Sequence, residues 1–134
     1  MLKRFAIYGT IGWGMEIFWT GLGSLFMGNW ELPGHTYIWM FPIYGLAVFL
    51  EPVQNKIEYL PWYLRGTIWA VIIFSLEYLT GGILIGLLGE CPWDYSNSTF
   101  YHVQGIIRLD YFPVWFVVGL LFERIHDNID EYKI

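Results

Sequence analysis

Four glutamates stand in or at the end of strongly apolar stretches of this chain, and their chemistry needs an explanation. They are Glu16, Glu51, Glu77 and Glu123. A carboxylate at membrane depth costs roughly 2.5–3.5 kcal/mol on insertion scales, so sequences keep such a group where it has a partner or a task. Carboxylates at this depth suit protons, metal cations or an amine-bearing solute, and they repel anions unless they are protonated.

The position of each glutamate along its apolar stretch divides the four into two pairs. At a helical rise of about 1.5 Å per residue, Glu16 and Glu77 lie about 17 and 20 Å from the starts of their stretches. Both are therefore expected near mid-bilayer, where we expect a functional role. Glu51 and Glu123 come later and are expected nearer the cytoplasmic boundary. For this second pair, simple contact with the interface is the alternative interpretation.

Helical spacing indicates what surrounds each glutamate. The face of Glu16 carries small residues, and so does the face of Glu77: Gly9, Gly12, Thr20 and Gly23 in the first case, Ala70, Thr80 and Gly81 in the second. Small residues allow close helix approach in lipid, so both glutamates are predicted to point at another helix. Tyr44 shares the face of Glu51 and joins the predicted substrate- or ion-binding set.

The composition places these residues in an integral membrane protein. The 134 residues are 56% hydrophobic, 21% aromatic and only 14% charged, whereas soluble domains are about a quarter charged. Four stretches approach the roughly 20 apolar residues that a span needs: 5–26, 37–50, 64–88 and 111–125. We predict an all-α, multi-pass protein of the cell membrane, with residues 1–134 in one transmembrane domain of four helices arranged as two tandem hairpins.

Basic residues predict the orientation of these four helices. They flank both termini and the middle loop at Lys3, Arg4, Lys56, Arg65, Arg124 and Lys133. The first and third loops hold only Arg108. The N and C termini are therefore predicted to be cytoplasmic.

The two predicted hairpins resemble each other, with halves at 1–58 and 59–134. The second stretch contains Phe41-Pro42-Ile43-Tyr44 and ends at Glu51, and the fourth contains Phe112-Pro113-Val114-Trp115 and ends at Glu123. Both halves begin on the cytoplasmic side, as in parallel internal repeats of some transporters. The alternative is convergence, since proline suits the first helical turn and aromatic residues collect at membrane interfaces.

The outer segment from Gly89 to Asp110 is longer than a simple connection needs. We interpret it as a gate or cap formed by Asp94, Tyr95, Ser96 and Arg108. The outer histidines match no zinc spacing, so no metal and no cofactor are predicted. No nucleic-acid signature is present, and the lipid bilayer is the first expected partner.

Four motifs occur in a characteristic order. They are Gly12-Trp13-x-x-Glu16, Pro42-Ile43-Tyr44-Gly45, Trp93-Asp94-Tyr95-Ser96 and Gly105-Ile106-Ile107-Arg108-Leu109. In them the chain resembles, over about residues 9–123, the small membrane proteins labelled "putative ABC-transporter type IV" (CmpB-like). The resemblance implies a transport role. It places Glu16, Tyr44, Asp94, Tyr95 and Ser96 at motif positions without assigning them roles.

The leading interpretation is a small transporter-like or substrate-binding protein with Glu16 and Glu77 lining a polar cavity. The Gly82-x-x-x-Gly86 sequence is a candidate homodimer interface. The chain contains no Walker motif, so if ATP is involved, a separate ATPase or other membrane subunit would have to bind it. The alternatives are an intramembrane enzyme acting on a lipid or isoprenoid, and a subunit or assembly factor of a larger complex.

Overall fold

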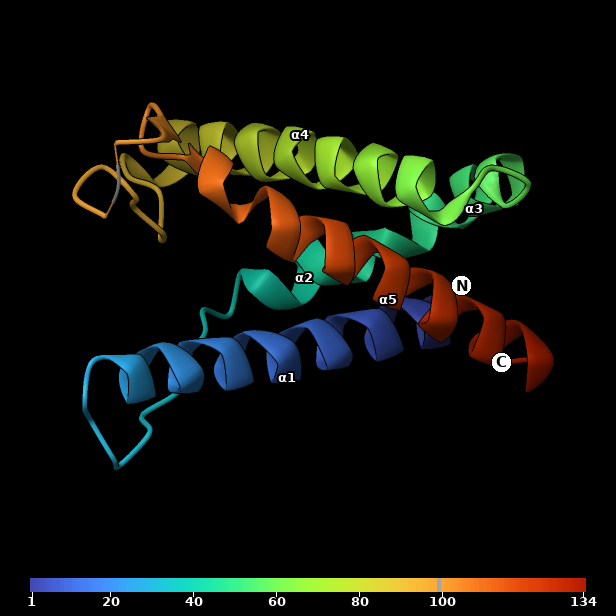
Figure 1. The fold of residues 1–134 in the computed structure, drawn as a ribbon, viewed down its shortest axis with the longest axis horizontal. Coiled ribbons are helices and arrows are strands. Elements are labelled where there is room, and N and C mark those ends of the chain that lie inside the picture. Colours follow the sequence, from blue (N-terminus) through green and yellow to red (C-terminus); the bar gives the residue numbers. More distant parts are fainter. Residues whose placement is uncertain (99) are drawn as a thin grey trace. The chain divides into compact units, whose positions relative to one another are not determined.

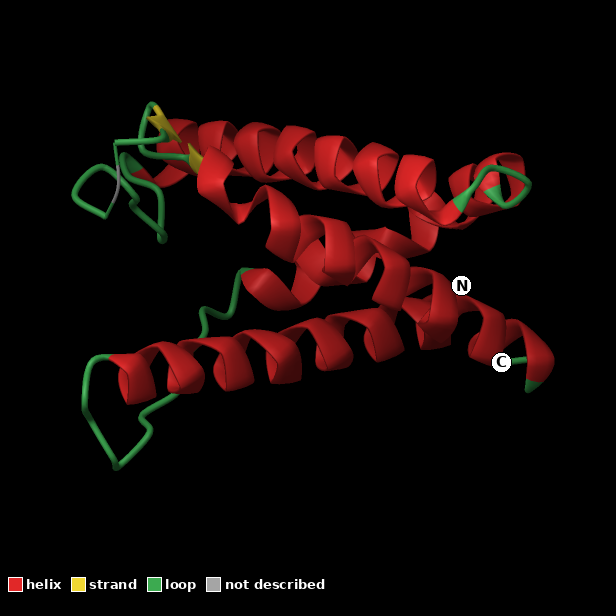
Figure 2. Cartoon of the chain, viewed as in Figure 1, coloured by secondary structure: helices red, strands yellow, loops and turns green. Residues whose placement is uncertain are grey.

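The computed structural model describes residues 1–98 and 100–134, most of which are helical (Figure 1). The helices are α1 (Leu2–Phe26), α2 (Met40–Gly45), α3 (Glu51–Ile57), α4 (Trp62–Leu88) and α5 (Phe112–Glu131), with short 3-10 helices η1 (Leu46–Leu50) and η2 (Leu109–Tyr111). The predominantly helical fold that was predicted is confirmed. The outer segment contains two antiparallel strands, β1 (His102–Val103) and β2 (Ile107–Arg108) (Figure 2).

The chain divides into two compact units. Unit 1 comprises Met1–Val53 with Tyr132–Ile134, and unit 2 comprises Gln54–Glu131. In unit 1, α1 packs against α2 and η1, and in unit 2, α4 packs against α5. Each unit therefore contains a long helix and a second helical segment that returns along it.

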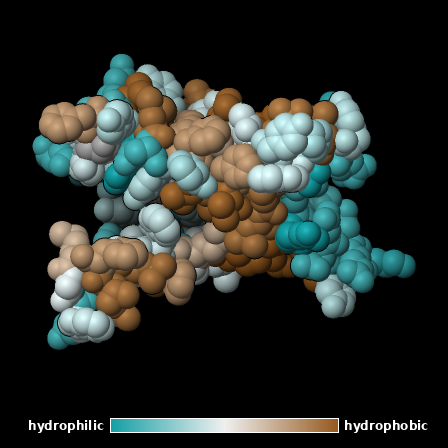
Figure 3. Space-filling view, in the orientation of Figure 1, coloured by the Kyte–Doolittle hydropathy of each residue, from teal (hydrophilic) through white to brown (hydrophobic). Residues whose placement is uncertain are grey.

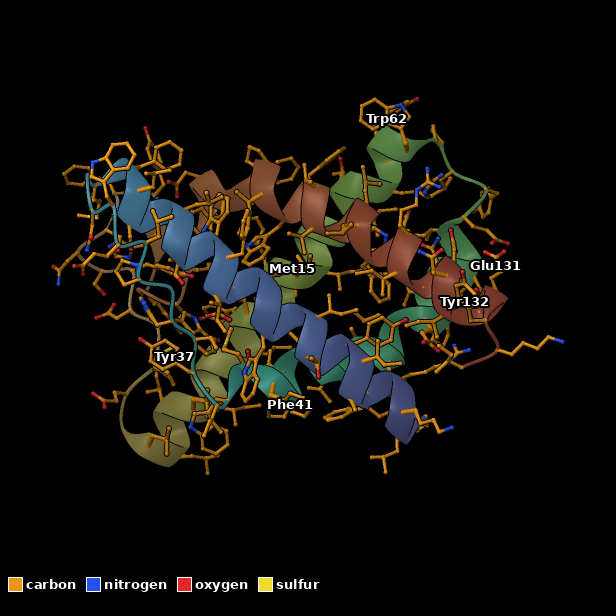
Figure 4. The ribbon with its side chains drawn as sticks, turned by 90° about the horizontal axis from the view of Figure 1, so that it is seen from below. Met15, Tyr37, Phe41, Trp62, Glu131 and Tyr132 are labelled. Carbon is orange, nitrogen blue, oxygen red and sulfur yellow. The ribbon has the colours of Figure 1, made fainter. Side chains whose placement is uncertain are left out.

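Glycines bring the two helices of unit 1 into close contact. A side chain at Gly9 would collide with Phe41 of α2, and one at Gly12 would collide with the ring of Tyr44. Figure 4 shows Phe41 on α2 beside α1. The small-residue face of α1 thus packs against another helix at these two positions, as its pattern predicted.

In unit 2, glycines likewise allow α4 and α5 to pack closely. A side chain at Gly119 would collide with Trp69, which is fully buried, and one at Gly66 would collide with the ring of Phe116. The absence of a Cβ atom lets each aromatic ring pack directly against backbone, which raises the packing density of the helix pair. The first turns of α5 are largely apolar, and hydrophilic residues gather at its C-terminal end (Figure 3).

Only α4, among the described residues, is both long and apolar enough to cross a membrane by itself. It has 27 residues, and 11% of its most apolar stretch is buried. Of the four predicted spans, only the third, which corresponds to α4, therefore meets both criteria. The predicted second span is wrong as a single α-helix, because residues 40–57 form α2, η1 and α3 in succession. The helix of the predicted fourth span extends six residues further, to Glu131.

Candidate functional site

Two side chains of α1 hold Glu51, which directly follows η1. The Arg4 guanidinium donates to Oε2 through Nη1 at 2.9 Å, and the Tyr8 hydroxyl donates to Oε1 at 2.9 Å. Arg4 and Tyr8 are four residues apart and so share one face of the helix. This face of α1 binds both carboxylate oxygens of Glu51.

Unit 2 repeats this arrangement around Glu123. Arg65 Nε donates to both carboxylate oxygens at 3.0 Å, and Trp69 Nε1 donates to Oε1 at 2.8 Å. Arg65 and Trp69 are again four residues apart. Glu123 is only 5% exposed, so its charge is balanced inside the unit rather than by solvent. We call these two arrangements the arginine clamps.

The two clamps hold their glutamates in the same way, although the stretch between the proline and the glutamate differs in length. Nine positions separate Pro42 from Glu51, and ten separate Pro113 from Glu123. The five residues of η1 account for the difference. A 3-10 helix has about 3.0 residues per turn and an α-helix about 3.6, so five 3-10 residues turn as far as six α-helical ones. Both glutamates therefore reach the same angular position relative to the preceding proline.

The clamps determine what Glu51 and Glu123 can do. In the Glu123 clamp, Arg65 and Trp69 have donors and no acceptor, so neither can accept a hydrogen bond from a protonated carboxyl. In the Glu51 clamp this holds for Arg4, whereas the Tyr8 hydroxyl can donate or accept. Charge-assisted bonds of this kind are about twice as strong as neutral ones. Through these ion pairs, each glutamate joins the long helix of its unit to the returning segment.

The loop between α1 and α2, residues 27–39, lies along α1 and is attached to it at three points. Ser24 Oγ donates to the carbonyl of Pro33 at 2.9 Å, and Trp13 Nε1 donates to the carbonyl of Tyr37 at 3.0 Å. Between them, Thr20 Oγ1 accepts a bond from the backbone N–H of His35 at 2.8 Å. Figure 4 shows Tyr37 beside α1. The loop therefore presents Thr36 to the middle of α1.

Thr36 and Tyr44 meet at Glu16. The hydroxyls of Thr36 and Tyr44 both approach the Glu16 carboxylate, and His35 lies close enough for an electrostatic interaction. Glu16 Oε2 and Thr36 Oγ1 are both buried, and neither atom has a hydrogen-bond partner among the described residues. The sequence pattern placed Tyr44 with Glu51. The structure places it with Glu16, because its ring packs on Gly12 one turn before that residue.

The outer segment folds through the residues of its own motif. Trp93 Nε1 donates to the carbonyl of Ile106 at 3.1 Å, and the N–H of Tyr95 donates to the carbonyl of Gly105 at 2.8 Å. Asp94 accepts bonds from the backbone N–H and the hydroxyl of Ser96, at 2.9 and 2.6 Å. Gly105 has φ +72° and faces Ser96 so closely that a side chain would collide.

These contacts place the Tyr95 hydroxyl next to Glu77, and the hydroxyl donates to Glu77 Oε1 at 3.2 Å. The Tyr95 ring packs edge-on against Tyr111, with ring centres 6.0 Å apart. The Arg108 guanidinium covers the Tyr111 ring at 4.2 Å. Tyr95 is thus the part of the Trp-Asp-Tyr-Ser motif that reaches a predicted binding residue.

The charged residues predicted for the gate are engaged within the segment itself. The two bonds from Ser96 lower the pKa of Asp94. Arg108 donates from Nε and Nη2 to Asp110 at 3.0 and 2.6 Å, which lowers the pKa of Asp110 and raises the pKa of Arg108. Both carboxyls are therefore ionised at neutral pH. The gating role of this segment stays a prediction.

The structure thus assembles two carboxylate–tyrosine sites, Glu16 with Tyr44 in unit 1 and Glu77 with Tyr95 in unit 2. The direct pairing of Glu16 with Glu77 stays a prediction. Among the described residues, no group of three histidine, cysteine, aspartate or glutamate side chains is arranged to hold a metal ion.

Sequence reasoning missed Thr36 and the donors of both clamps. The clamp donors did leave a signal, because Arg4 and Arg65 each precede an aromatic residue by four positions, and 61 positions separate both members of one pair from those of the other. Thr36 left none. Its position depends on how the loop folds back on α1.

A family model described as putative ABC-transporter type IV matches residues 4–132. The chain belongs to this family. The matched range includes the residues of both arginine clamps and both carboxylate–tyrosine sites. No solved structure matches the chain.

Proposed function

We propose that this protein is a small transporter-like membrane protein in which Glu16 and Glu77 bind and release a cation. The observation that carries the proposal is the difference in the partners of the four glutamates. Glu51 and Glu123 receive bonds from arginines. A tyrosine hydroxyl approaches Glu16 and another donates to Glu77, whereas Glu51 has a tyrosine hydroxyl, that of Tyr8, in addition to its arginine. A hydroxyl can donate or accept, so these sites tolerate a change of charge that an arginine clamp opposes.

In length alone, the helical segments fit the proposed four membrane crossings, although only α4 is also apolar enough by itself. Helix α1 has 25 residues and α5 has 20, which correspond to about 37 and 30 Å. The segments α2, η1 and α3 follow one another without a break from Met40 to Ile57. A hydrocarbon core is about 30 Å thick. With the basic residues at the termini and middle loop, the proposed topology has both termini in the cytoplasm.

The matching clamps support an internal duplication as part of this proposal. Each unit has a donor pair four residues apart, a glutamate two turns further along the long helix, and a glutamate at the end of the returning segment. Convergence explains a proline and aromatic residues. It does not explain why two returning segments of unequal length each bring a glutamate to a pair of donors at equivalent positions of the long helix.

Flux measurements on proteoliposomes test the cation-binding role. The variants are Glu16→Gln and Glu77→Gln, with Glu90→Gln as the matched control because Glu90 is exposed in the outer segment. We expect each site variant to lose at least tenfold in proton or cation flux and the control to keep it. Flux that is unchanged in both site variants would exclude the carboxylate pathway.

A second candidate is a subunit of a larger complex. Helix α4 favours it, since the helix is apolar and little of its most apolar stretch is buried. A Cβ atom added at Gly82 or Gly86 would meet nothing within 4 Å. Small residues on such a face suit a second helix. Native mass spectrometry of the purified protein distinguishes a homodimer, a stoichiometric complex with an ATPase, and a monomer. The monomer would contradict this candidate.

A further inference from the structure

The hairpin of the outer segment turns at Gln104 and Gly105, which have φ values of +53° and +72°. Strands β1 and β2 lie on either side of the turn, with His102 paired opposite Arg108 (Figure 2). Positive φ at both central residues matches the twist of the two strands, but a residue other than glycine adopts it at a cost. The conformation of this turn therefore depends on the bonds that hold it.

His102 supplies one of these bonds from its side chain. The backbone N–H of Gly105 donates to His102 Nδ1 at 3.0 Å. A backbone N–H can only donate, so Nδ1 must present a lone pair and the imidazole must be neutral. A protonated imidazole carries hydrogen on both nitrogens and cannot accept this bond. Protonation of His102 would thus remove the acceptor of the N–H of Gly105, which is buried.

Gly105 links this bond to the Glu77–Tyr95 site. The carbonyl of Gly105 accepts a bond from the backbone N–H of Tyr95 at 2.8 Å. The Tyr95 hydroxyl in turn donates to Glu77 Oε1 at 3.2 Å. Three hydrogen bonds therefore connect the ring of His102 to the carboxylate of Glu77.

We propose that His102 is a positioning residue that makes the Glu77–Tyr95 site respond to pH on the outer side. Neutral His102 holds the turn and keeps Tyr95 on Glu77. On acidification, Nδ1 takes a proton from a hydronium ion, which becomes water, and the bond from Gly105 is lost. Imidazole ordinarily changes its charge between about pH 5 and 8, so the bond is present above this range and absent below it. This inference names a regulation of the proposed function, and its effect on flux rests on that function.

Two charged groups face His102 from neighbouring segments. Asp94 lies close enough for its charge to interact with the imidazole, and Arg108 is the residue opposite His102 in the strand pair. The charge of Arg108 is already balanced by Asp110. The hydrogen bonds to Asp94 come from the neutral groups of Ser96. Asp94 is therefore the counter-charge that a protonated His102 would find within the segment.

A single amide signal of the full-length protein in detergent micelles tests the bond. Gln104–Gly105 is the only glutamine–glycine step in the chain, because the other glutamine, Gln54, precedes Asn55. Labelling with carbonyl-13C glutamine and 15N glycine therefore selects the amide of Gly105. Its proton resonance should move upfield as the pH falls from about 8 to 5, because the hydrogen bond is lost. A resonance that keeps its position over this range would overturn the proposal.

Two variants assign the change to His102. In His102→Asn a carbonyl oxygen that does not titrate replaces Nδ1, so the Gly105 resonance should keep its bonded position at every pH. In His102→Leu the acceptor is absent, so the resonance should stay at the unbonded position. The matched control His35→Asn, at the other outer histidine, should titrate as the unaltered protein does. A full titration in His102→Asn would assign the change to another group and overturn the role of His102.

Cation flux in proteoliposomes separates this inference from the proposed function. The ratio of unaltered to His102→Asn flux should be near one above the titration range. Below it the ratio should rise about fivefold, the equivalent of one ordinary hydrogen bond, because Tyr95 then leaves Glu77 open to the outer side. A Gly105 titration that depends on His102 in a protein without flux supports the switch and contradicts transport. Flux that depends on Glu77, at a ratio that is constant with pH, supports transport and contradicts the regulation.

Discussion

Arg65 and Trp69 can only donate hydrogen bonds, and both donate to Glu123. The fixed charge of an arginine distinguishes Glu51 and Glu123, each of which forms an ion pair within its unit, at the scale of single residues. At Glu77 the bonded group is the Tyr95 hydroxyl, which can donate or accept, so the proposed change of charge at Glu77 keeps a hydrogen bond to Tyr95.

The variant Glu123→Gln should destabilise unit 2. It leaves the Arg65 guanidinium, only about a quarter exposed, without its ion partner. Breaking one side of a buried pair typically costs 3–5 kcal/mol, and the partial exposure of Arg65 favours the lower end, about 3 kcal/mol. Denaturant unfolding in detergent micelles measures this difference. Glu131→Gln is the control on the same helix because Glu131 is exposed, and equal stability of the two variants would contradict the clamp.

Within each unit, the elements are joined by glycines that meet aromatic rings. Gly12 meets Tyr44 in unit 1, and Gly119 meets Trp69 in unit 2. Each ring belongs to a residue that also bonds a glutamate. The close helix approach and the carboxylate bonds therefore depend on each other. A change in helix separation alters both.

Two glycine-to-alanine variants test this packing at the element scale. Gly119→Ala places a Cβ atom against Trp69 and should cost about 1–3 kcal/mol, the usual penalty for overpacking. Gly82→Ala in α4 has open space around it and should gain up to about 1 kcal/mol from helix propensity. Unfolding midpoints that shift in opposite directions would confirm the contact. A stable Gly119→Ala with unchanged tryptophan fluorescence would contradict it.

For the whole molecule, the arrangement of segments across the bilayer decides which ends of the helices face water. Cysteine labelling tests this topology. In a Cys91→Ser background, a membrane-impermeant maleimide should label Asn97→Cys in intact cells, because residue 97 is exposed in the outer segment. Glu58→Cys, in the exposed turn between α3 and α4, should be labelled only after permeabilisation. The reverse result would invert the proposed orientation.

Sequence reasoning identified the four glutamates, the long helices and the small-residue face of α1, because apolar composition and helical periodicity are local properties. The partners of the glutamates are not local. Arg4 lies 47 positions from Glu51, and Arg65 lies 58 positions from Glu123. No periodicity within one helix can reveal contacts between positions so far apart.

The amino-acid sequence by itself determined that this protein is apolar, mostly helical and supplied with four glutamates in its apolar stretches. Only the tertiary structure decided which of them are clamped by arginine. The physical reason lies in the returning segments. In unit 1 a 3-10 helix sets the rotation that brings Glu51 to its donors, and the loops that carry Thr36 and Tyr95 are held by hydrogen bonds to their backbone groups.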